Sequence, residues 1–354
     1  MSKIKLPVTR YYGSKRKLVE KIWNELERKE LIFDSVLDIF GGTGLFSFYA
    51  KCKNKQVIYN DIFRFNSIIG KKLIQQSSNE LTLERARNML LPIEGVIYRN
   101  VISENFAGIY FTDEENHQID IFIQNINFLE NENLQASAYY ILFQSCIIKR
   151  PYNLFHRNNL NMRLNYKNGN FGNKKTWERS FSELFERFIN ELDEFCFDNG
   201  EENISLNSSA LQCNAQANLL YIDPPYFTSG SNTTYHSKYH FLEGLAYYDE
   251  IQKNIDHNKK NKEITINKSL EFENKTTFLN DLEQLLLNHI NSHIVISYRN
   301  NGVPNIEEMA ELLRNINNNF EVSVTDLGNY GYALNRNNIN NNEVLIIAKN
   351  IYYE

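Results

Sequence analysis

Residues 35–61 carry the pattern that most restricts how this chain can fold. Two short apolar runs, SVLDIF (35–40) and QVIYND (56–61), are separated by a glycine-rich turn and by LFSFYAKCKN, which is long enough for a helix. Apolar runs that alternate with a helical stretch are typical of two parallel strands joined by a crossover helix. The chain is therefore expected to begin with the first unit of a parallel α/β sheet.

Further strands are expected towards the C-terminal side, where short apolar and β-branched runs recur. The segment IEEMAELLRNI (306–316) lies among them and has its apolar residues at helical spacing. The expected strands cover residues 203–207, 219–225, 293–298, 320–327 and 343–349. Together with the first unit they predict one open sheet that resumes after an interruption.

The interruption, from about residue 81 to residue 200, differs in composition from the rest. It is rich in aromatic, helix-like segments such as SAYYILFQSCIIKR (137–150) and in basic or asparagine-rich loops. A separate, mainly helical module inserted into the sheet domain is therefore expected. The predicted division is residues 1–80 and 201–354 for the two parts of the sheet domain and 81–200 for the insert. The charged segment 250–274 is expected to be a surface excursion.

The loop after the first strand supplies candidate ligand-binding residues. Glycines allow a tight turn and a close approach of the backbone to a ligand, and the helix that follows offers unpaired N–H groups. The loop resembles a dinucleotide-binding turn, but Phe46 and Ser47 stand near the position of that motif's third glycine. On the glycines alone, a purely structural turn is an alternative. The residues of the loop are Asp38, Ile39, Phe40, Gly41, Gly42, Thr43 and Gly44.

The second strand ends in Asn60-Asp61, about 20 residues after this loop. A carboxylate at that place can accept hydrogen bonds from both hydroxyl groups of a ribose. Asp61 is therefore predicted to hold a ligand that contains a nucleoside. The alternative is that Asp61 caps the helix that follows.

The segment YIDPPYF (221–227) joins an apolar strand to an acid, two prolines and two aromatic residues. The prolines make a rigid exit at the carboxyl end of the strand, which is the edge where open α/β sheets bind ligands. The Asp223 carboxylate and the adjacent carbonyl can accept hydrogen bonds from an amine, and Tyr226 can stack on a planar base. Asp223, Pro224 and Tyr226 are thus predicted to hold a flipped nucleobase by its exocyclic amine, with positioning as the main catalytic contribution. A proline-stiffened loop with a structural aspartate is the alternative.

On these residues the chain resembles the adenine-specific DNA methyltransferases of the Dam type, whose hallmark is DPPY, and especially those that accompany type IIS restriction enzymes. Supporting segments are Arg10-Tyr11-Tyr12-Gly13-Ser14-Lys15, the DIFGGTG loop and Tyr239-His240-Phe241-Leu242-Glu243. The resemblance implies a Rossmann-like methyltransferase sheet with a helical target-recognition domain inserted in it. It also implies methyl transfer from S-adenosylmethionine to the N6 amino group of a flipped adenine in double-stranded DNA.

The family pattern implies roles for individual residues. Tyr11 and Lys15 would contact the methionine end of the cofactor, where an ammonium can pair with the carboxylate. Asp61 would hold the cofactor ribose, and Asp223 would lie between the cofactor and the target amine. The remaining members of the expected cofactor site are Asp38, Phe40, Gly41, Gly42 and Gly44.

The chain departs from the family pattern after the strand that precedes DPPY. Many relatives carry an acidic residue there, near the cofactor adenine, whereas this chain has Asn207-Ser208-Ser209-Ala210. A serine hydroxyl can replace the carboxylate as an acceptor, with less charge assistance. The contact to the cofactor adenine is therefore the least defined part of the expected site.

Basic residues interleaved with aromatic ones mark a candidate DNA-binding region within the insert. The net charge of −5 argues against a protein that coats nucleic acid over its whole surface, so a local basic patch is needed. The segments KRPYNLFHR (149–157) and NFGNKK (170–175) suit phosphate contact, base reading and stacking. Arg150, Arg157 and Arg163 are the predicted contacts, with a solvated basic loop as the alternative.

The residues leave other substrates open at this point. The same chemistry would serve amino-cytosine in DNA, adenine in RNA or glutamine in a protein. Asp223 favours adenine, because cytosine-specific relatives tend to carry serine in its place. A nucleotide-binding module without catalysis is a further alternative, against which the intact Asp223, Pro224 and Tyr226 argue.

The four cysteines, Cys52, Cys146, Cys196 and Cys213, form no CxxC pair and have no zinc-ligand spacing, so neither a metal site nor a disulfide framework is expected.

No apolar run approaches the length of about 18 residues needed to span a membrane, and a cytoplasmic location is expected. Expected partners are double-stranded DNA and a cognate restriction endonuclease, with the chain as a monomer or weak dimer.

Overall fold

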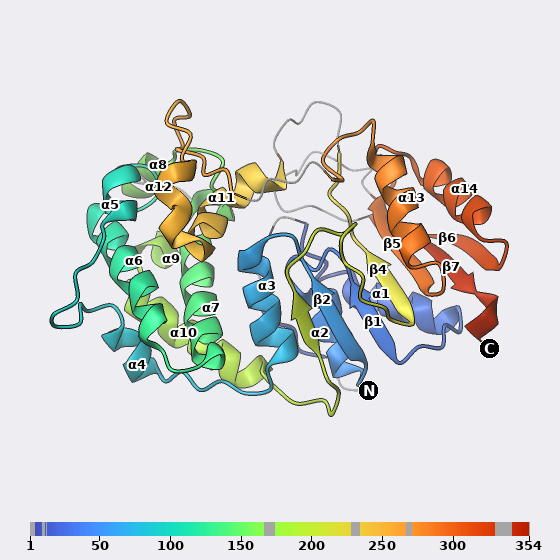
Figure 1. Ribbon diagram of the computed structural model, residues 1–354, viewed down its shortest axis with the longest axis horizontal. Coiled ribbons are helices and arrows are strands. Elements are labelled where there is room, and N and C mark those ends of the chain that lie inside the picture. Colours follow the sequence, from blue (N-terminus) through green and yellow to red (C-terminus); the bar gives the residue numbers. More distant parts are fainter. Residues whose placement is uncertain are drawn as a thin grey trace.

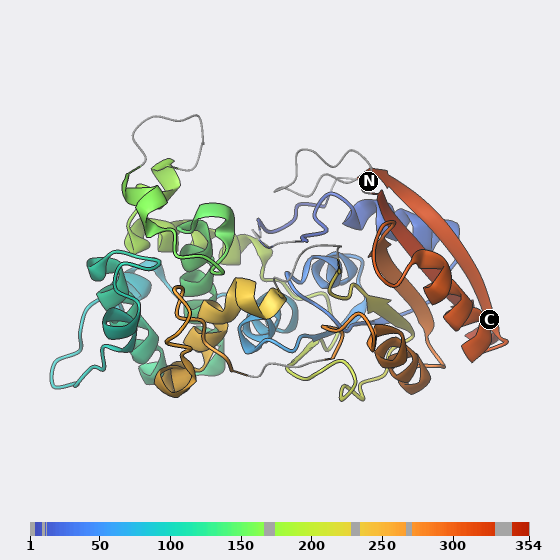
Figure 2. The same ribbon diagram turned by 90° about the horizontal axis from the view of Figure 1, so that it is seen from above.

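The computed structural model describes residues 4–8, 11, 13–165, 174–227, 234–266, 271–329 and 342–353. A sheet with its covering helices lies beside a helical part, and the two occupy opposite ends of the molecule in both views (Figures 1 and 2). Arg10 and Tyr12 of the N-terminal motif and residues 170–173 of the basic segment lie outside the described residues. Among the described helices, none combines the length and apolar character needed to cross a membrane.

The described strands form one mixed sheet of seven strands in the order β3-β2-β1-β4-β5-β7-β6. Neighbours from β3 to β5 run parallel, whereas β7 is antiparallel to both β5 and β6. This confirms the prediction of a single sheet resumed after an interruption. The strands are β1 Ser35–Asp38, β2 Gln56–Asn60, β3 Ile204–Leu206, β4 Leu219–Ile222, β5 His293–Arg299, β6 Phe320–Asn329 and β7 Asn342–Asn350.

The helices divide between the two parts of the molecule. Around the sheet lie α1 Val19–Arg28, α2 Leu45–Cys52, α3 Arg64–Gly70, α13 Phe278–Asn288 and α14 Ile306–Ile316. The helical part holds α4 Leu83–Asn88, α5 Val101–Asn105, α6 Asp113–Asn125, α7 Glu132–Ile148, α8 Leu160–Leu164, α9 Lys174–Glu178 and α10 Phe181–Phe195. Later in the chain come α11 Tyr235–Ala246 and α12 Ile251–Asn254, and short turns are η1 Lys71–Gln75, η2 Ile126–Phe128, η3 Pro151–Asn153, η4 Tyr248–Glu250 and η5 Ile351–Tyr353.

The central strands are apolar because helices cover both of their faces. Successive side chains of a strand point to opposite faces, and in β4 both sets are fully buried. Leu219 and Tyr221 join the core that contains α1 and α2. Leu220 and Ile222 join a second core with α13 and α14. Such continuous apolar runs are the signature of strands buried on both sides.

The strand order reverses at β1, which lies between β2 and β4. The chain builds β2 and β3 on one side of β1 and then crosses to the other side for β4 and β5. Asp38 of β1 is in register with Tyr221 of β4, so the carboxyl ends of both strands meet at one edge. Open α/β sheets bind ligands in the crevice at such a switch point.

Helices α11 and α12 lie with the helical part, although the predicted division placed residues 201–354 in the sheet domain (Figure 1). Helix α11 contacts α7 and α3, and α12 contacts α5. The cause is apolar packing, since Phe241 of α11 stacks on Phe155 with 5.1 Å between ring centroids. The charged segment after α12 is less superficial than expected, because Ile255 and Ile264 are buried.

Candidate cofactor and catalytic site

A pocket opens at the carboxyl ends of β1 and β4, with about 720 Å³ of space that is partly continuous with solvent. Each predicted cofactor residue except Gly44 lines it. Gly44 lies one step further along, at the start of α2, with a positive φ of 68°. The lining residues from the prediction are Tyr11, Lys15, Asp38, Phe40, Gly41, Gly42, Asp61 and Asp223.

Two of the loop glycines have no substitute in this geometry. A Cβ atom on Gly41 would lie 2.1 Å from the ring of Tyr59, which is fully buried and cannot move aside. Gly42 has a φ of 50°, and its N–H donates to Asp61 Oδ2 at 2.8 Å. The turn therefore brings the backbone against β2 and fixes Asp61 at the pocket wall.

Asp61 accepts hydrogen bonds from neighbouring loop residues and also lines the pocket. Besides the Gly42 N–H, it accepts the N–H of Phe63 at 2.8 Å and the side-chain amide of Asn66 at 3.2 Å. Burial raises the pKa of Asp61 to about 6, although these hydrogen bonds oppose the rise. The capping and the ribose-binding interpretations are thus compatible.

The two carboxylate oxygens of Asp38 differ in their hydrogen bonding. Its Oδ2 accepts from Ser47 Oγ at 2.6 Å, whereas its buried Oδ1 has no hydrogen-bond partner among the described residues. Burial raises the pKa of Asp38 to about 7. Because an unpaired buried carboxylate oxygen is costly, this atom suits a ligand that brings an ammonium or N–H group.

The predicted catalytic loop leads into a buried charge cluster. The Lys15 ammonium lies 3.1 Å from Asp223 Oδ1 and 2.5 Å from Glu343 Oε1. The Tyr226 hydroxyl donates to Asp223 Oδ1 and also contacts Lys15. Pro224, between them, is buried. The structure thus brings the predicted Asp223, Tyr226 and Lys15 together and adds Glu343.

The cluster changes the ionisation of its members. Burial raises the pKa of Asp223 to about 6, with Lys15 opposing the rise and Glu343 adding to it. Burial alone would lower the pKa of Lys15, but the charges of Asp223 and Glu343 outweigh it and raise that pKa. Lys15 is therefore a firmly protonated cation shared by two carboxylates.

Two residues of the downstream motif YHFLE (239–243) contact the segments that form the wall of the pocket. Tyr239 stacks on Tyr11 with 4.2 Å between ring centroids and 4° between ring planes. The Glu243 carboxylate accepts the N–H groups of Arg64 and Phe65, both at 3.1 Å, at the start of α3. Helix α11 thereby fixes the positions of Tyr11 and of the start of α3 relative to each other. No group of three or more His, Cys, Asp or Glu in the described parts of the chain is placed to hold a metal ion.

The residues Asn207 to Ala210, where the chain departs from the family pattern, follow β3 and contact the segment that follows β2. The Asn207 side chain donates to the carbonyls of Asp61 and Ile62, both at 2.9 Å. Ser208 Oγ donates to the carbonyl of Ser209, and Ala210 lines a smaller adjoining pocket with Phe40 and Phe63. Among the described residues that line the two pockets, Ser208 is absent, so the structure does not bring its hydroxyl to the cofactor site.

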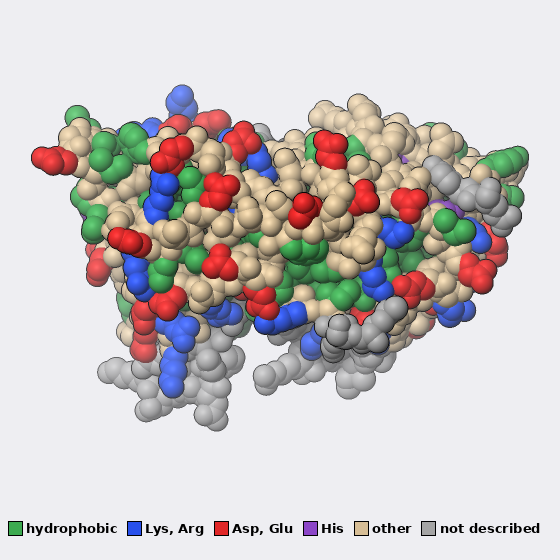
Figure 3. All heavy atoms as spheres, turned by 90° about the horizontal axis from the view of Figure 1, so that it is seen from below, with side chains coloured by type: hydrophobic (Ala, Val, Ile, Leu, Met, Phe, Trp, Pro, Cys, Tyr) green, Lys and Arg blue, Asp and Glu red, His purple; other side chains and the backbone are tan. Residues whose placement is uncertain are grey.

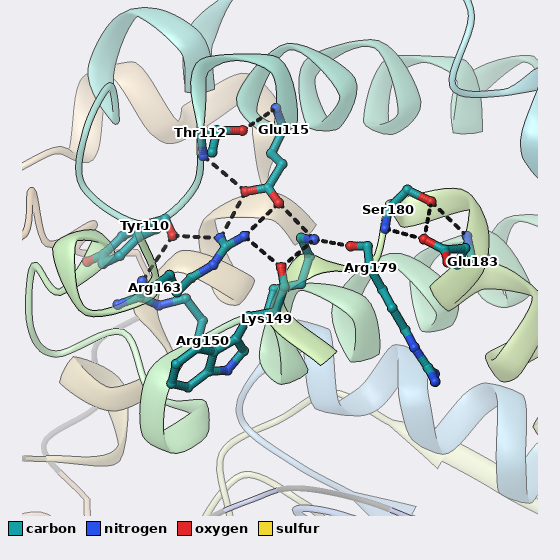
Figure 4. A network of polar contacts seen from close by, with 10 residues as sticks. Tyr110, Thr112, Glu115, Lys149, Arg150, Arg163, Arg179, Ser180 and Glu183 are labelled. Carbon is teal, nitrogen blue, oxygen red and sulfur yellow. Dashed lines mark hydrogen bonds and ion pairs between the residues drawn. The ribbon is translucent and has the colours of Figure 1, made fainter. Parts of the chain in front are cut away.

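The structure corrects two of the three predicted DNA contacts (Figure 4). Arg150 is fully buried and donates to the carbonyls of Tyr110, Leu154 and Arg157. The Arg163 guanidinium pairs with Glu115 at 2.7 Å and is almost wholly buried. A guanidinium must reach solvent to meet a phosphate, so neither is placed for that contact.

Arg157 is exposed and remains the predicted contact. Its backbone carbonyl is one of the groups that Arg150 holds at 3.0 Å, so the buried arginine shapes the loop that presents the exposed one. On the face of the molecule shown in Figure 3, acidic and basic side chains are interspersed, in keeping with the net charge of −5. A DNA-binding surface therefore has to be local.

Fold and pocket define an α/β protein with a ligand crevice at the switch point of a mixed sheet, consistent with an S-adenosylmethionine-dependent methyltransferase fold. The family model for D12 class N6 adenine-specific DNA methyltransferases matches residues 11–295. The chain belongs to this family, which confirms the expectation from the motifs. It is an adenine-specific DNA methyltransferase, and the alternatives of cytosine, RNA, protein or lost catalysis fall away.

Curated relatives carry names from restriction-modification systems. Type II methyltransferase M2.HphI of Haemophilus parahaemolyticus is 27% identical over 321 residues, covering 88% of this chain and 89% of the relative. Type II methyltransferase M.NlaIII of Neisseria lactamica is 25% identical over 320 residues, covering 85% and 86%. Modification methylase StsI of Streptococcus sanguinis is 26% identical over 332 residues, covering 86% of this chain but 46% of the relative. The chain thus spans about half the length of the StsI methylase.

Proposed function

We propose that the protein methylates adenine within a specific sequence of double-stranded DNA, as the modification enzyme of a restriction-modification system, using the pocket at β1 and β4 for S-adenosylmethionine. The observation that carries the proposal is that Asp38, Asp61 and Asp223 line one pocket at the switch point of the sheet. The relatives' names and the family support the substrate and the context.

Two carboxylates of the pocket suit two parts of the cofactor. The unpaired Asp38 Oδ1 suits its ammonium, and Asp61 suits its ribose hydroxyls. When bound, S-adenosylmethionine supplies a methyl group activated by a sulfonium. Lys15 remains a predicted neighbour of the methionine end, yet it is already held by Asp223 and Glu343, so a ligand carboxylate has to compete for it.

The catalytic loop would act by holding and orienting the target amine. The Asp223 carboxylate accepts one N–H and a loop carbonyl accepts the other, so that the nitrogen lone pair faces the cofactor. Tyr226 provides a face for stacking on the flipped base. We assign target recognition to the helical part, extended by α11 and α12, which pack on it.

Sequencing that detects modified bases, applied to DNA from cells that express the protein, tests the proposal directly. N6-methyladenine at one recurrent sequence is expected. Methylation without sequence preference, or of another base, would contradict it.

Replacing Asp61 with alanine is expected to weaken S-adenosylmethionine binding by at least about tenfold, because hydrogen bonds to a charged acceptor each contribute about 1.5–3 kcal/mol. Titration calorimetry measures the change. Asp34→Ala, at an exposed aspartate just before β1, is the matched control and should leave the affinity unchanged. Unchanged affinity in a folded Asp61→Ala protein would remove the ribose role.

Replacing Arg157 with alanine is expected to weaken binding to duplex DNA and to reduce the salt slope of that binding by about one unit. Binding measured at several salt concentrations checks this, with Arg314→Ala on α14, in the sheet part, as the control. Cofactor affinity should stay unchanged. A loss of cofactor affinity with intact DNA binding would show that Arg157 has been misplaced.

A further inference from the structure

Glu343 is a buried acid whose place the catalytic scheme above does not explain. It lies at the start of β7, opposite Arg299 of β5, and its side chain has no exposed surface. It accepts hydrogen bonds from Ser297 Oγ at 2.6 Å and from Lys15 Nζ at 2.5 Å, and the Tyr226 hydroxyl lies 3.3 Å away. Glu343 does not line the pocket, so an effect on the reaction has to pass through neighbours such as these.

The geometry shows how Lys15 is divided between two carboxylates. Its ammonium is closer to Glu343, at 2.5 Å, than to Asp223, at 3.1 Å. Without Glu343, Asp223 would be the one carboxylate of this cluster left for the ammonium, which the Tyr226 hydroxyl also contacts. A closer ion pair would then take up part of the acceptor capacity of Asp223. One cation between two carboxylates also leaves the cluster with a net negative charge.

A negative cluster suits the charge that the reaction creates. As the bond from sulfur to the methyl carbon breaks and the bond from nitrogen to that carbon forms, positive charge moves from sulfur to the amine nitrogen. The nitrogen then loses one proton, for which the Asp223 carboxylate is the adjacent acceptor. A carboxylate neutralised by a tight pair with Lys15 would stabilise that charge less.

We infer that Glu343 is a positioning residue, which holds the Lys15 ammonium partly away from Asp223 so that Asp223 keeps its charge and acceptor capacity for the target amine. This inference rests on the proposed role of Asp223. In the described part of the chain, the titratable groups around Asp223 are Lys15 from the N-terminal loop, Glu343 from β7, Tyr226 from its own loop, Asp38 from β1 and Tyr221 from β4.

Glu343→Gln tests the inference because it keeps the shape and the acceptor oxygen while removing the charge. The single-turnover rate of methyl transfer at neutral pH should fall by about tenfold or more. The acidic limb of the pH profile should move to lower pH, since Glu343 is one of the causes that raise the pKa of Asp223. A residue with a merely structural role would not move this limb.

Lys15→Met should shift the acidic limb of the pH profile in the opposite direction, and it provides a test even if Glu343→Gln fails to fold. Removing the cation leaves two carboxylates together, so the acidic limb should move to higher pH. Glu343→Asp, which keeps the charge, should return the limb towards the wild-type position. Glu321→Gln, an exposed acid on β6, is the matched control and should leave both rate and limb unchanged.

The outcomes separate this inference from the proposed function. If wild-type protein transfers no methyl group to adenine in DNA, the proposed function fails. If the wild type is active but neither Glu343→Gln nor Lys15→Met moves the acidic limb in its stated direction, the positioning role of Glu343 is overturned while the function stands.

Discussion

Replacing Asp223 with alanine is expected to lower the rate of methyl transfer to adenine by at least about 10²–10³-fold, the usual cost of losing one preorganised group at the reacting centre. The Asp223 carboxylate follows β4 directly, lines the pocket and pairs with Lys15. Single-turnover transfer of a labelled methyl group to duplex DNA measures the loss.

Two controls sharpen this test. Asp34→Ala, at an exposed aspartate just before β1, should retain full activity. In the wild type, the rate should fall as the pH drops through about 6, because Asp223 must be ionised to accept from the amine and burial raises its pKa to that value. Full activity in a folded Asp223→Ala protein would end the catalytic assignment.

Replacing Glu115 with glutamine is expected to destabilise the helical part by about 3–5 kcal/mol, the usual cost of breaking a buried ion pair. Glu115 is the shared carboxylate of two buried cations, Lys149 and Arg163, each at 2.7 Å (Figure 4). Without its charge, both cations stay buried beside carbonyl groups alone. Urea denaturation followed by the fluorescence of Trp177, which lies in the same network, reports the change.

The pH dependence of this effect has a definite sign. Burial alone would raise the pKa of Glu115, but Arg163 and Lys149 outweigh it and lower that pKa. The stabilisation is therefore fully present above the unfolded value of about 4.3 and is lost as the pH falls through the lower folded value. Glu114→Gln, an exposed neighbour, should change stability by less than about 0.5 kcal/mol. Equal stability of the two variants would contradict the assignment.

The sheet and the lining of the pocket could be predicted because both depend on local patterns. Each strand is a short apolar run, and the glycine loop, Asp61 and Asp223 follow strands directly, so their common edge follows from parallel pairing. Glu343 could not be assigned in this way. Its strand was predicted, but its place beside Lys15 depends on β7 entering between β5 and β6, which no local pattern specifies.

The prediction that Arg150 contacts DNA was wrong because composition does not show where a side chain points. A basic segment rich in aromatic residues has the same composition whether its guanidinium faces a phosphate or a ring. Here the guanidinium lies 4.4 Å from the centroid of the Tyr110 ring and binds carbonyl groups of its own loop. Only the fold decides between the two, because several residues far apart in sequence must converge to bury it.

The insertion of β7 beside β5 has a consequence for the order in which the enzyme becomes active during synthesis. Lys15 and Glu343 are separated by 328 positions, so the ribosome has to add all the residues between them before the two can meet. A nascent chain can already contain the cofactor loop and the DPPY segment while its Lys15 still lacks this counter-charge. Full methylating capacity should therefore arise only once β7 has left the ribosome and entered the sheet.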